Sequence, residues 1–430
     1  MRNSGTDEFQ RRALLLAGVR AMAVALAGSV STPSRLFATE QMSAFDGLEQ
    51  RLAGAVEAYD SQGNHRTATA ADNGSAEWLV RQTRQLGAQP SVESFPLSRI
   101  DPLSCHLRVA GRRIEGVPLF DGMFTGAEGV HGTLGVLGSD ADIVLVETEP
   151  FTLIEPRKEM RGPVAEARRG PHKGVVILTR GSRPGLFLLN APSFKAPFGP
   201  PALQISSAES EWLKARAQER TEVSLVAQVE RTSTQAINVT ARISGSDPGL
   251  APLVVTTPRS GWWECASERG GGLACWLEAI GTLAAASPAR DCLFAAFSGH
   301  EIGFLGIEAY LANRPDLLKR AHAWVHIGAN IGAPRQPNQV HVSDSLESWI
   351  AAALKNEGLS IDNKAQSGSV PRGEAGAIHR GGARYVALVC GTEVFHNTAD
   401  RWPDAVDVTV LARYARTFST GALELARQQS

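Results

Sequence analysis

The chain has 430 residues, with 43 Lys and Arg against 44 Asp and Glu, so its formal net charge is −1 at pH 7. This balance argues against nucleic acid as a partner, because a surface that binds phosphates carries an excess of basic residues. A hydrophobic fraction of 43% can form a buried core, which excludes a mainly disordered chain, and five scattered cysteines form neither a disulfide framework nor a cysteine-based zinc site.

The first 38 residues have the pattern of an export signal. Arg11 and Arg12 precede a moderately apolar stretch over residues 13–30, which is typical of twin-arginine signals. Arg20 interrupts this stretch, which is too short for a permanent membrane span of ~20 apolar residues. The pattern predicts a bacterial protein that is exported to the periplasm or secreted, with no membrane span once residues 1–38 are removed. The alternative is a cytosolic protein with an amphipathic leader helix.

Residues 39–100 show the spacing of helices. Apolar side chains recur every three or four residues, as on one helix face, at Phe45, Leu48, Leu52 and Val56. Residues 76–86 repeat this pattern. We interpret 39–100 as the N-terminal part of the main domain.

Residues 101–235 have a different pattern. Short β-like runs alternate with Gly and Pro, which predicts an inserted β-rich domain. The expected strands lie at residues 133–137, 143–147, 174–178 and 221–229.

Residues 236–430 alternate between strand-like and helix-like segments. Strands are expected at 252–257, 291–298, 324–328 and 385–390, and helices at 272–285, 305–312, 344–356 and 406–427. Alternation of this kind predicts an α/β fold, in which a mostly parallel mixed sheet carries helices on both faces. Active sites of such sheets lie outside the carboxyl ends of the strands. The loops to inspect are therefore Pro258–Ser260, Gly299–Glu301, His326–Asn330 and Phe395–His396.

These loops, in this order, resemble those of the co-catalytic zinc aminopeptidases, whose fold also underlies glutamate carboxypeptidases and glutaminyl cyclases. Phe297–Gly306 resembles the double-glutamate motif and Phe395–Asp400 the motif of the last metal ligand. His65–Thr69 with Ser75–Leu79 resembles the start of the family's N-terminal helix. Within 101–235, residues 174–178 and 201–206 resemble the protease-associated insert. The resemblance implies this fold for nearly the whole mature chain.

The resemblance also implies an altered metal site. Two ligands of one zinc are replaced here, by Pro258 and Ala329, whereas the ligand types of the other zinc remain as Glu268, Glu301 and His396. Two carboxylates and one imidazole with an open position form a plausible catalytic zinc set. The expectation is one zinc ion per chain, as the likeness to glutaminyl cyclases implies.

Three further residues are candidates for chemistry. His300 stands where the family has its general-base glutamate, and it can exchange a proton near neutral pH, act as a fourth ligand, or be an inert filler. Arg259 follows a lost ligand position, and its guanidinium can pair with Glu268 or hold a substrate carboxylate; the alternative is an arginine on a solvated loop. Glu374 is a candidate for binding a substrate amine.

Three functions fit this pattern. The first is an exported one-zinc hydrolase of a small peptide or other amide, and the second is a glutaminyl-cyclase-like acyl-transfer enzyme. The third is a non-catalytic binding protein on a peptidase fold. Loss of the base glutamate favours the binding protein, because such a group contributes about 10²–10⁴-fold in rate. Retention of one complete ligand set favours an enzyme, which is our expectation from sequence.

Overall fold

The computed structural model describes residues 47–150, 162–366 and 368–429. The predicted export signal at 1–38 lies outside these residues. From Gly47 onward the chain forms one compact unit. Among the helices of the described ranges, none combines the length and apolar character needed to cross a bilayer.

The centre of the fold is a group of parallel strands in the order β14-β11-β9-β10. They are β9 (Leu253–Pro258), β10 (Cys292–Phe297), β11 (Ala323–Ile327) and β14 (Tyr385–Cys390). Almost every residue in them is buried, as expected for strands covered on both faces. Beyond β14, β12 (Asn338–Val342) pairs antiparallel and β13 (Asn363–Lys364) follows. The prediction of a mostly parallel mixed sheet is confirmed.

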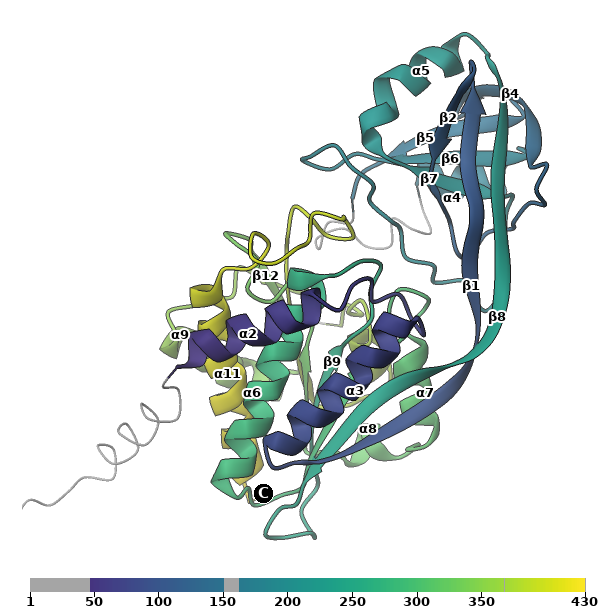
Figure 1. Cartoon of the computed structure of the whole chain (residues 1–430). Helices are drawn as coiled ribbons and strands as arrows, with labels where there is room; N and C mark the ends of the chain where they lie inside the picture. Colours follow the sequence, from purple (N-terminus) through teal and green to yellow (C-terminus); the bar gives the residue numbers. More distant parts are fainter. Residues whose placement is uncertain (1–46, 151–161, 367, 430) are drawn as a thin grey trace, which may run out of the picture. The chain divides into compact units, whose positions relative to one another are not determined.

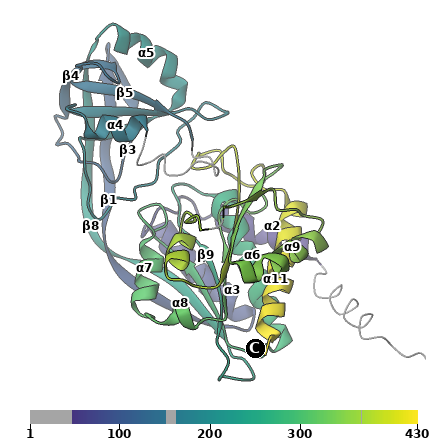
Figure 2. The same ribbon diagram turned by 180° about the vertical axis from the view of Figure 1, so that it is seen from behind.

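Helices cover both faces because side chains alternate across each strand. On one face, α6 (Gly271–Ala286) packs on β9 and against α11 (Val408–Arg427), with α2 (Leu48–Asp60) and α3 (Ala70–Gln85) beside them (Figure 1). The other face has a core that includes Val254, Phe297 and Trp324 under α7 (Leu305–Ala312), α8 (Leu317–Arg320) and α10 (Ala375–Arg380). The opposite view brings α7 and α8 to the front (Figure 2). Helix α9 (Asp344–Asn356) packs against α11.

Two long antiparallel strands, β1 (Gln89–Val109) and β8 (Glu222–Ile243), were not predicted at this length. Both are drawn as continuous arrows in Figure 1. Strand β8 pairs with β10 at one end and with β4 at the other. Proline lacks an N–H group, yet Pro90 and Pro96 lie within the continuous register of β1 with β8, and Pro102 lies where that register shifts by a bulge. Read in sequence, the same prolines look like strand breaks.

Residues between β1 and β8 form a smaller βα unit. Strands β4 (Val130–Val136), β5 (Ile143–Thr148), β6 (Gly174–Thr179) and β7 (Ala202–Ile205) run parallel in that order, and short strands β2 (Arg112–Glu115) and β3 (Val117–Pro118) flank them. Helices α4 (Pro163–Arg169) and α5 (Ser210–Gln218) pack on this part, and a short 3₁₀ turn, η2 (Ser207–Glu209), precedes α5. Strand β1 crosses the expected boundary at residue 100 and β8 that at residue 235, so the insert's boundaries stay a prediction.

Candidate active site

The loops that follow the carboxyl ends of the parallel strands meet as expected. Arg259 N–H donates to Phe297 O at 2.7 Å, which joins the loops after β9 and β10. Gly299 N–H donates to Ser260 Oγ at 2.8 Å. Cys265 and His396 adopt positive φ angles of 56° and 60°. This conformation is uncommon for residues other than glycine, and it occurs most often at active sites and ligand-binding sites.

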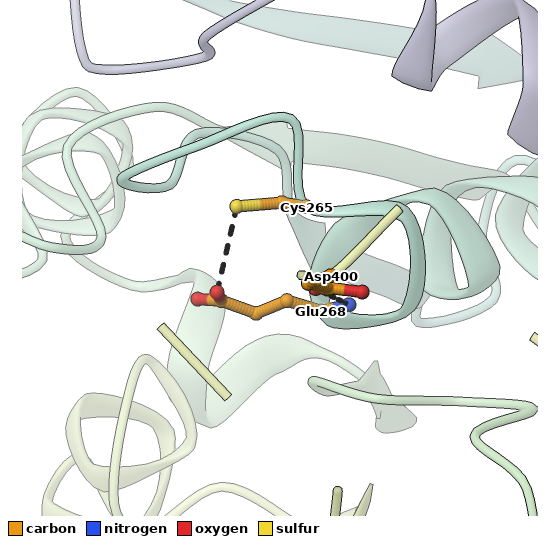
Figure 3. Close-up of side chains that lie close together, drawn as sticks. All are labelled: Cys265, Glu268 and Asp400. Atoms are coloured by element: carbon orange, nitrogen blue, oxygen red, sulfur yellow. Dashed lines mark hydrogen bonds between the residues drawn. The ribbon is translucent and has the colours of Figure 1, made fainter. Parts of the chain in front are cut away.

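Glu268 lies on a π-helical turn, Ala266–Gly270, that leads into α6. The Asp400 carboxylate accepts hydrogen bonds from the amides of Ser267 and Glu268, at 2.7 and 2.9 Å, and so caps this turn. Burial, together with the charge of Glu268, raises the pKa of Asp400 to about 7. Cys265 Sγ lies 3.4 Å from Glu268 Oε2, and Figure 3 shows the three side chains. Among the described residues they form a group of possible ligand atoms within 4.8 Å of one another.

Arg269, directly after Glu268, neutralises it. Arg269 Nη2 lies 2.6 Å from Glu268 Oε1, and both side chains are buried. Arg269 Nε donates to Ser260 O at 2.6 Å, which holds the guanidinium in place. Burial raises the pKa of Glu268, but the Arg269 guanidinium and His396 outweigh it and bring that pKa to about 2. The guanidinium that the sequence assigned to Arg259 thus comes from Arg269.

His396 is the second predicted ligand beside Glu268. Its Nε2 lies 3.4 Å from Glu268 Oε1, and neither atom has a hydrogen-bond partner. Its Nδ1 lies 2.8 Å from Leu188 O. Because a carbonyl oxygen only accepts, Nδ1 carries a proton and donates to Leu188 O. The structure therefore brings two of the three predicted ligands together.

Glu301, the third predicted ligand, is held by protein donors. Its buried carboxylate accepts from Thr67 N at 2.7 Å, Thr67 Oγ1 at 2.5 Å and Ser260 Oγ at 2.7 Å. Within the described ranges, Glu301 does not join Glu268 and His396 in a group of three ligand atoms within 4.8 Å. The hydroxyls of Thr67 and Ser260 thus surround a carboxylate that was expected to face a metal.

His300 is paired with Glu374. His300 Nδ1 lies 2.9 Å from both carboxylate oxygens of Glu374, and the imidazole stays 10% exposed. His326 Nε2 approaches Glu374 Oε2 at 3.9 Å, while its Nδ1 lies 3.0 Å from Thr256 Oγ1. Burial raises the pKa of Glu374, yet His300 and His326 bring it to about 2, and burial lowers the pKa of His326 to about 4. Glu374 orients His300, whereas the sequence suggested that it binds a substrate amine.

Arg259 has a structural partner. It is fully buried and forms an ion pair with Asp72, Nη1 to Oδ1 at 2.7 Å. Nη1 also donates to Asp72 O, while Nε and Nη2 both donate to Ile237 O. Every nitrogen of Arg259 is engaged inside the protein, and none is directed to Glu268 or to a substrate as predicted.

These contacts test whether the residues fit a zinc ion. Two atoms fit, because Glu268 Oε1 and His396 Nε2 are buried without hydrogen-bond partners, and a carbonyl that fixes the other imidazole nitrogen is usual for a ligating histidine. The rest does not fit, since Arg269 already neutralises the Glu268 oxygen and Glu301 accepts three hydrogen bonds from protein donors. A catalytic zinc needs three protein ligands. Glu268, Glu301 and His396 do not form that set, whereas Cys265, Glu268 and Asp400 offer three possible ligand atoms within 4.8 Å of one another. The number of ions stays a prediction.

A cavity of about 710 Å³ reaches this site. Its lining includes Phe187, Phe198, Phe395, His396, Arg168 and Asn190. Arg168 pairs with Asp121 at 3.0 Å and stacks on the Phe198 ring. Residues 187–190 line the cavity, and Leu188 O among them accepts from His396 Nδ1, so this segment both orients His396 and forms one wall of the cavity.

Sequence reasoning missed Arg269 and the pairing of His300 with Glu374. Arg269 had one available signal, its position directly after the retained carboxylate. His300 and Glu374 are 74 residues apart in the chain, and no local pattern links them.

No family model matches the chain, and no curated protein matches it. Several solved structures match the chain. A zinc aminopeptidase from Bacillus subtilis aligns with a TM-score of 0.71 and 18% identity over 90% of this chain and 96% of its own. A peptidase M28 precursor from Shewanella amazonensis gives a TM-score of 0.71 at 16% identity, covering 91% and 98%.

An aminopeptidase from an Aneurinibacillus species gives a TM-score of 0.65 at 16% identity, covering 89% of this chain and 95% of its own. The fold is therefore that of the zinc aminopeptidases, as the sequence resemblance implied. At these identities the likeness concerns the fold alone.

Proposed function

We propose that this protein binds a peptide or another amide-bearing ligand in the cavity beside Glu268 and His396, and that it does so without hydrolysing the ligand. The observation that carries this proposal is the state of Glu301. Its carboxylate accepts three hydrogen bonds from Thr67 and Ser260, which leaves the expected ligand set incomplete.

The cavity supports a ligand-binding role. Its volume of about 710 Å³ lies within the usual range of small-molecule sites, about 300–1,000 Å³. Aromatic rings such as Phe187 and Phe395 supply apolar surface, and Asn190 supplies a polar group that can pair with an amide. If the predicted export signal is correct, the ligand is met outside the cytoplasm.

A one-zinc amide hydrolase is the second candidate. It is favoured by Glu268 Oε1 and His396 Nε2, two buried atoms 3.4 Å apart without hydrogen-bond partners. His300, oriented by Glu374, would then replace the family's glutamate as the proton-transferring group. A glutaminyl-cyclase-like reaction differs from hydrolysis only in its product.

One comparison separates these functions. Purified protein, with and without added Zn²⁺, is offered leucine and arginine p-nitroanilides and a peptide with N-terminal glutamine, while calorimetry measures binding of the matching tripeptides. We expect binding without turnover. Turnover that is lost in both His396→Ala and Glu301→Ala would establish an enzyme, and the glutamine product would distinguish cyclase from hydrolase.

A cavity variant with a matched control locates the bound ligand. Ser193→Trp places a large ring in the cavity wall, whereas Ser98→Trp places the same ring on an exposed position of β1. We expect at least tenfold weaker peptide binding in the first variant and no change in the second. Equal affinities in both variants, or no binding of any peptide by the wild type, would refute the proposal.

A further inference from the structure

The charge balance of the site depends on one buried guanidinium. Arg269 is fully buried, and its Nη2 lies 2.6 Å from Glu268 Oε1. Its other nitrogens donate to backbone oxygens, Nε to Ser260 O at 2.6 Å and Nη1 to Glu268 O at 3.1 Å. A buried charge without a partner is strongly unfavourable. Arg269 and Glu268 therefore stabilise each other's charged forms.

The backbone fixes where this guanidinium lies. Arg269 follows Glu268 within the π-helical turn Ala266–Gly270. At Gly271, the first residue after this turn, a Cβ atom would lie 1.9 Å from Ile331 O, so the chain is packed too closely for a side chain there. Because Glu268 and Arg269 are neighbours on this one turn, the same backbone segment positions both charges.

A third group, His396, lies beside this pair. Its Nδ1 donates to Leu188 O, and its Nε2 lies 3.4 Å from Glu268 Oε1. In zinc enzymes a metal ion is commonly bound between a carboxylate and an imidazole. Among the described residues, Arg269 is the cation that contacts Glu268 Oε1, at 2.6 Å.

We infer that Arg269 is a built-in cation that takes the place of a metal ion, and that its removal turns Glu268 and His396 into a divalent-metal site. With the guanidinium present, a divalent ion on Glu268 Oε1 would lie only a few ångströms from another positive charge. At a separation of about 4 Å, repulsion between a divalent and a monovalent cation weakens binding by about 30-fold even at the dielectric constant of bulk water. The inference concerns metal and charge, and it does not depend on which ligand the cavity binds.

Metal titration of Arg269→Met tests this inference directly. Methionine keeps much of the side-chain volume and removes the charge. We expect full-length Arg269→Met to bind one Co²⁺ per chain, seen in the visible absorption of the ion, at least about 30-fold more tightly than the wild type. Zn²⁺ should displace the Co²⁺. Wild-type protein that binds Co²⁺ as tightly as the variant, or a folded variant that binds none, would overturn the inference.

Two controls tie the gain to these residues. Arg269→Lys keeps a cation and should bind Co²⁺ as weakly as the wild type, whereas Arg269→Met/His396→Ala should lose the gain. If Arg269→Met does not fold, Arg269→Gln, which keeps a donor for Ser260 O, serves for the same titration.

A double-mutant cycle reads the charge pairing without any metal. Removing both charges leaves no unpaired ion, so Glu268→Gln/Arg269→Met should unfold at a higher denaturant concentration than Arg269→Met. A double variant no more stable than Arg269→Met would show that the two charges are not coupled and would refute the inference.

Discussion

Two buried arginine–carboxylate pairs lie in the loops after the parallel strands, and they differ in how completely they are bonded. In Arg259–Asp72, every guanidinium nitrogen has an acceptor, and Asp72 Oδ2 also accepts from Ala68 N and Ser298 Oγ. In Arg269–Glu268, the atoms Glu268 Oε1 and Arg269 Nη2 form an ion pair 2.6 Å apart, but neither atom has a hydrogen-bond partner.

This difference separates a structural role from a site. A buried pair with all its donors and acceptors satisfied holds chain segments together, here α3, β8 and the loop after β9. The buried pair Arg269–Glu268 has a carboxylate oxygen without a hydrogen-bond partner that lies 3.4 Å from His396 Nε2, and ionisable groups that perturb one another in this way are typical of a functional site. Arg259, which follows the replaced ligand position Pro258, belongs to a pair with a structural role.

The largest effect should follow from breaking the fully bonded pair. Arg259→Met leaves the buried Asp72 without its counter-ion, and removal of one partner of a buried pair costs about 3–5 kcal/mol of unfolding free energy. Urea unfolding of the variant measures this loss. The double variant Arg259→Met/Asp72→Asn should lose less than the single one. A loss under about 1 kcal/mol in Arg259→Met would remove the distinction between the two pairs.

Acid should also weaken the region around the fully bonded pair, through His65. Burial, with a smaller contribution from Arg259, lowers the pKa of His65 to about 4, although its bond to Tyr59 O and the charge of Asp60 oppose this. Because the unfolded chain binds the proton more readily, His65 contributes stability above pH 6.5 that is lost as the pH falls toward 4. The loss amounts to about 3 kcal/mol.

His65→Phe should flatten the pH dependence of unfolding between pH 6.5 and 4, since phenylalanine can keep the stack on Tyr59 without titrating. The exposed His131 provides the matched control, and His131→Gln should leave the profile unchanged. An unchanged slope in His65→Phe would contradict the assignment.

The next prediction concerns Glu301, which shares its partner Ser260 with Arg269. Glu301→Gln replaces a carboxylate that accepts from Thr67 and Ser260, and the expected loss is about 1.5–3 kcal/mol, the range for hydrogen bonds to a charged group. Zn²⁺ should not raise the melting temperature of the wild type or the variant. A zinc-dependent rise in the wild type that disappears in Glu301→Gln would make Glu301 a ligand after all. Glu308→Gln, on the surface beside Lys195, is the control.

The parallel sheet could be predicted because buried strands are continuous apolar runs, and Tyr385–Cys390 and Leu305–Ala312 lie where the sequence placed them. The length of β1 could not be predicted, because Pro90 and Pro96 are typical of strand breaks, whereas in the structure both pair with residues of β8. The correct elements and the missed length of β1 have one cause: a local sequence pattern indicates burial and spacing, but it does not indicate which strand pairs with which.

For the site, the sequence placed the right loops together but could not assign partners within them. From sequence, Arg259 is considered as a partner of Glu268, and Arg269 is missed although it directly follows Glu268. In the structure Glu268 and Arg269 lie on the π-helical turn Ala266–Gly270, and Arg269 Nε donates to Ser260 O. One extra residue in a turn is a tertiary feature without a sequence signature here.

The smallest expected effect isolates burial from distance. Arg216 Nη2 lies 2.6 Å from Glu219 Oε1, the same separation as in Arg269–Glu268, but Glu219 is 56% exposed. Water and salt screen such a pair, so Glu219→Gln should change the unfolding free energy by less than about 0.5 kcal/mol, and added salt should abolish even that. Unfolding in low and high salt measures both. A cost that approaches that of a buried pair would mean that separation alone sets the strength of these contacts, and the comparison between Arg259 and Arg269 would then lose its physical basis.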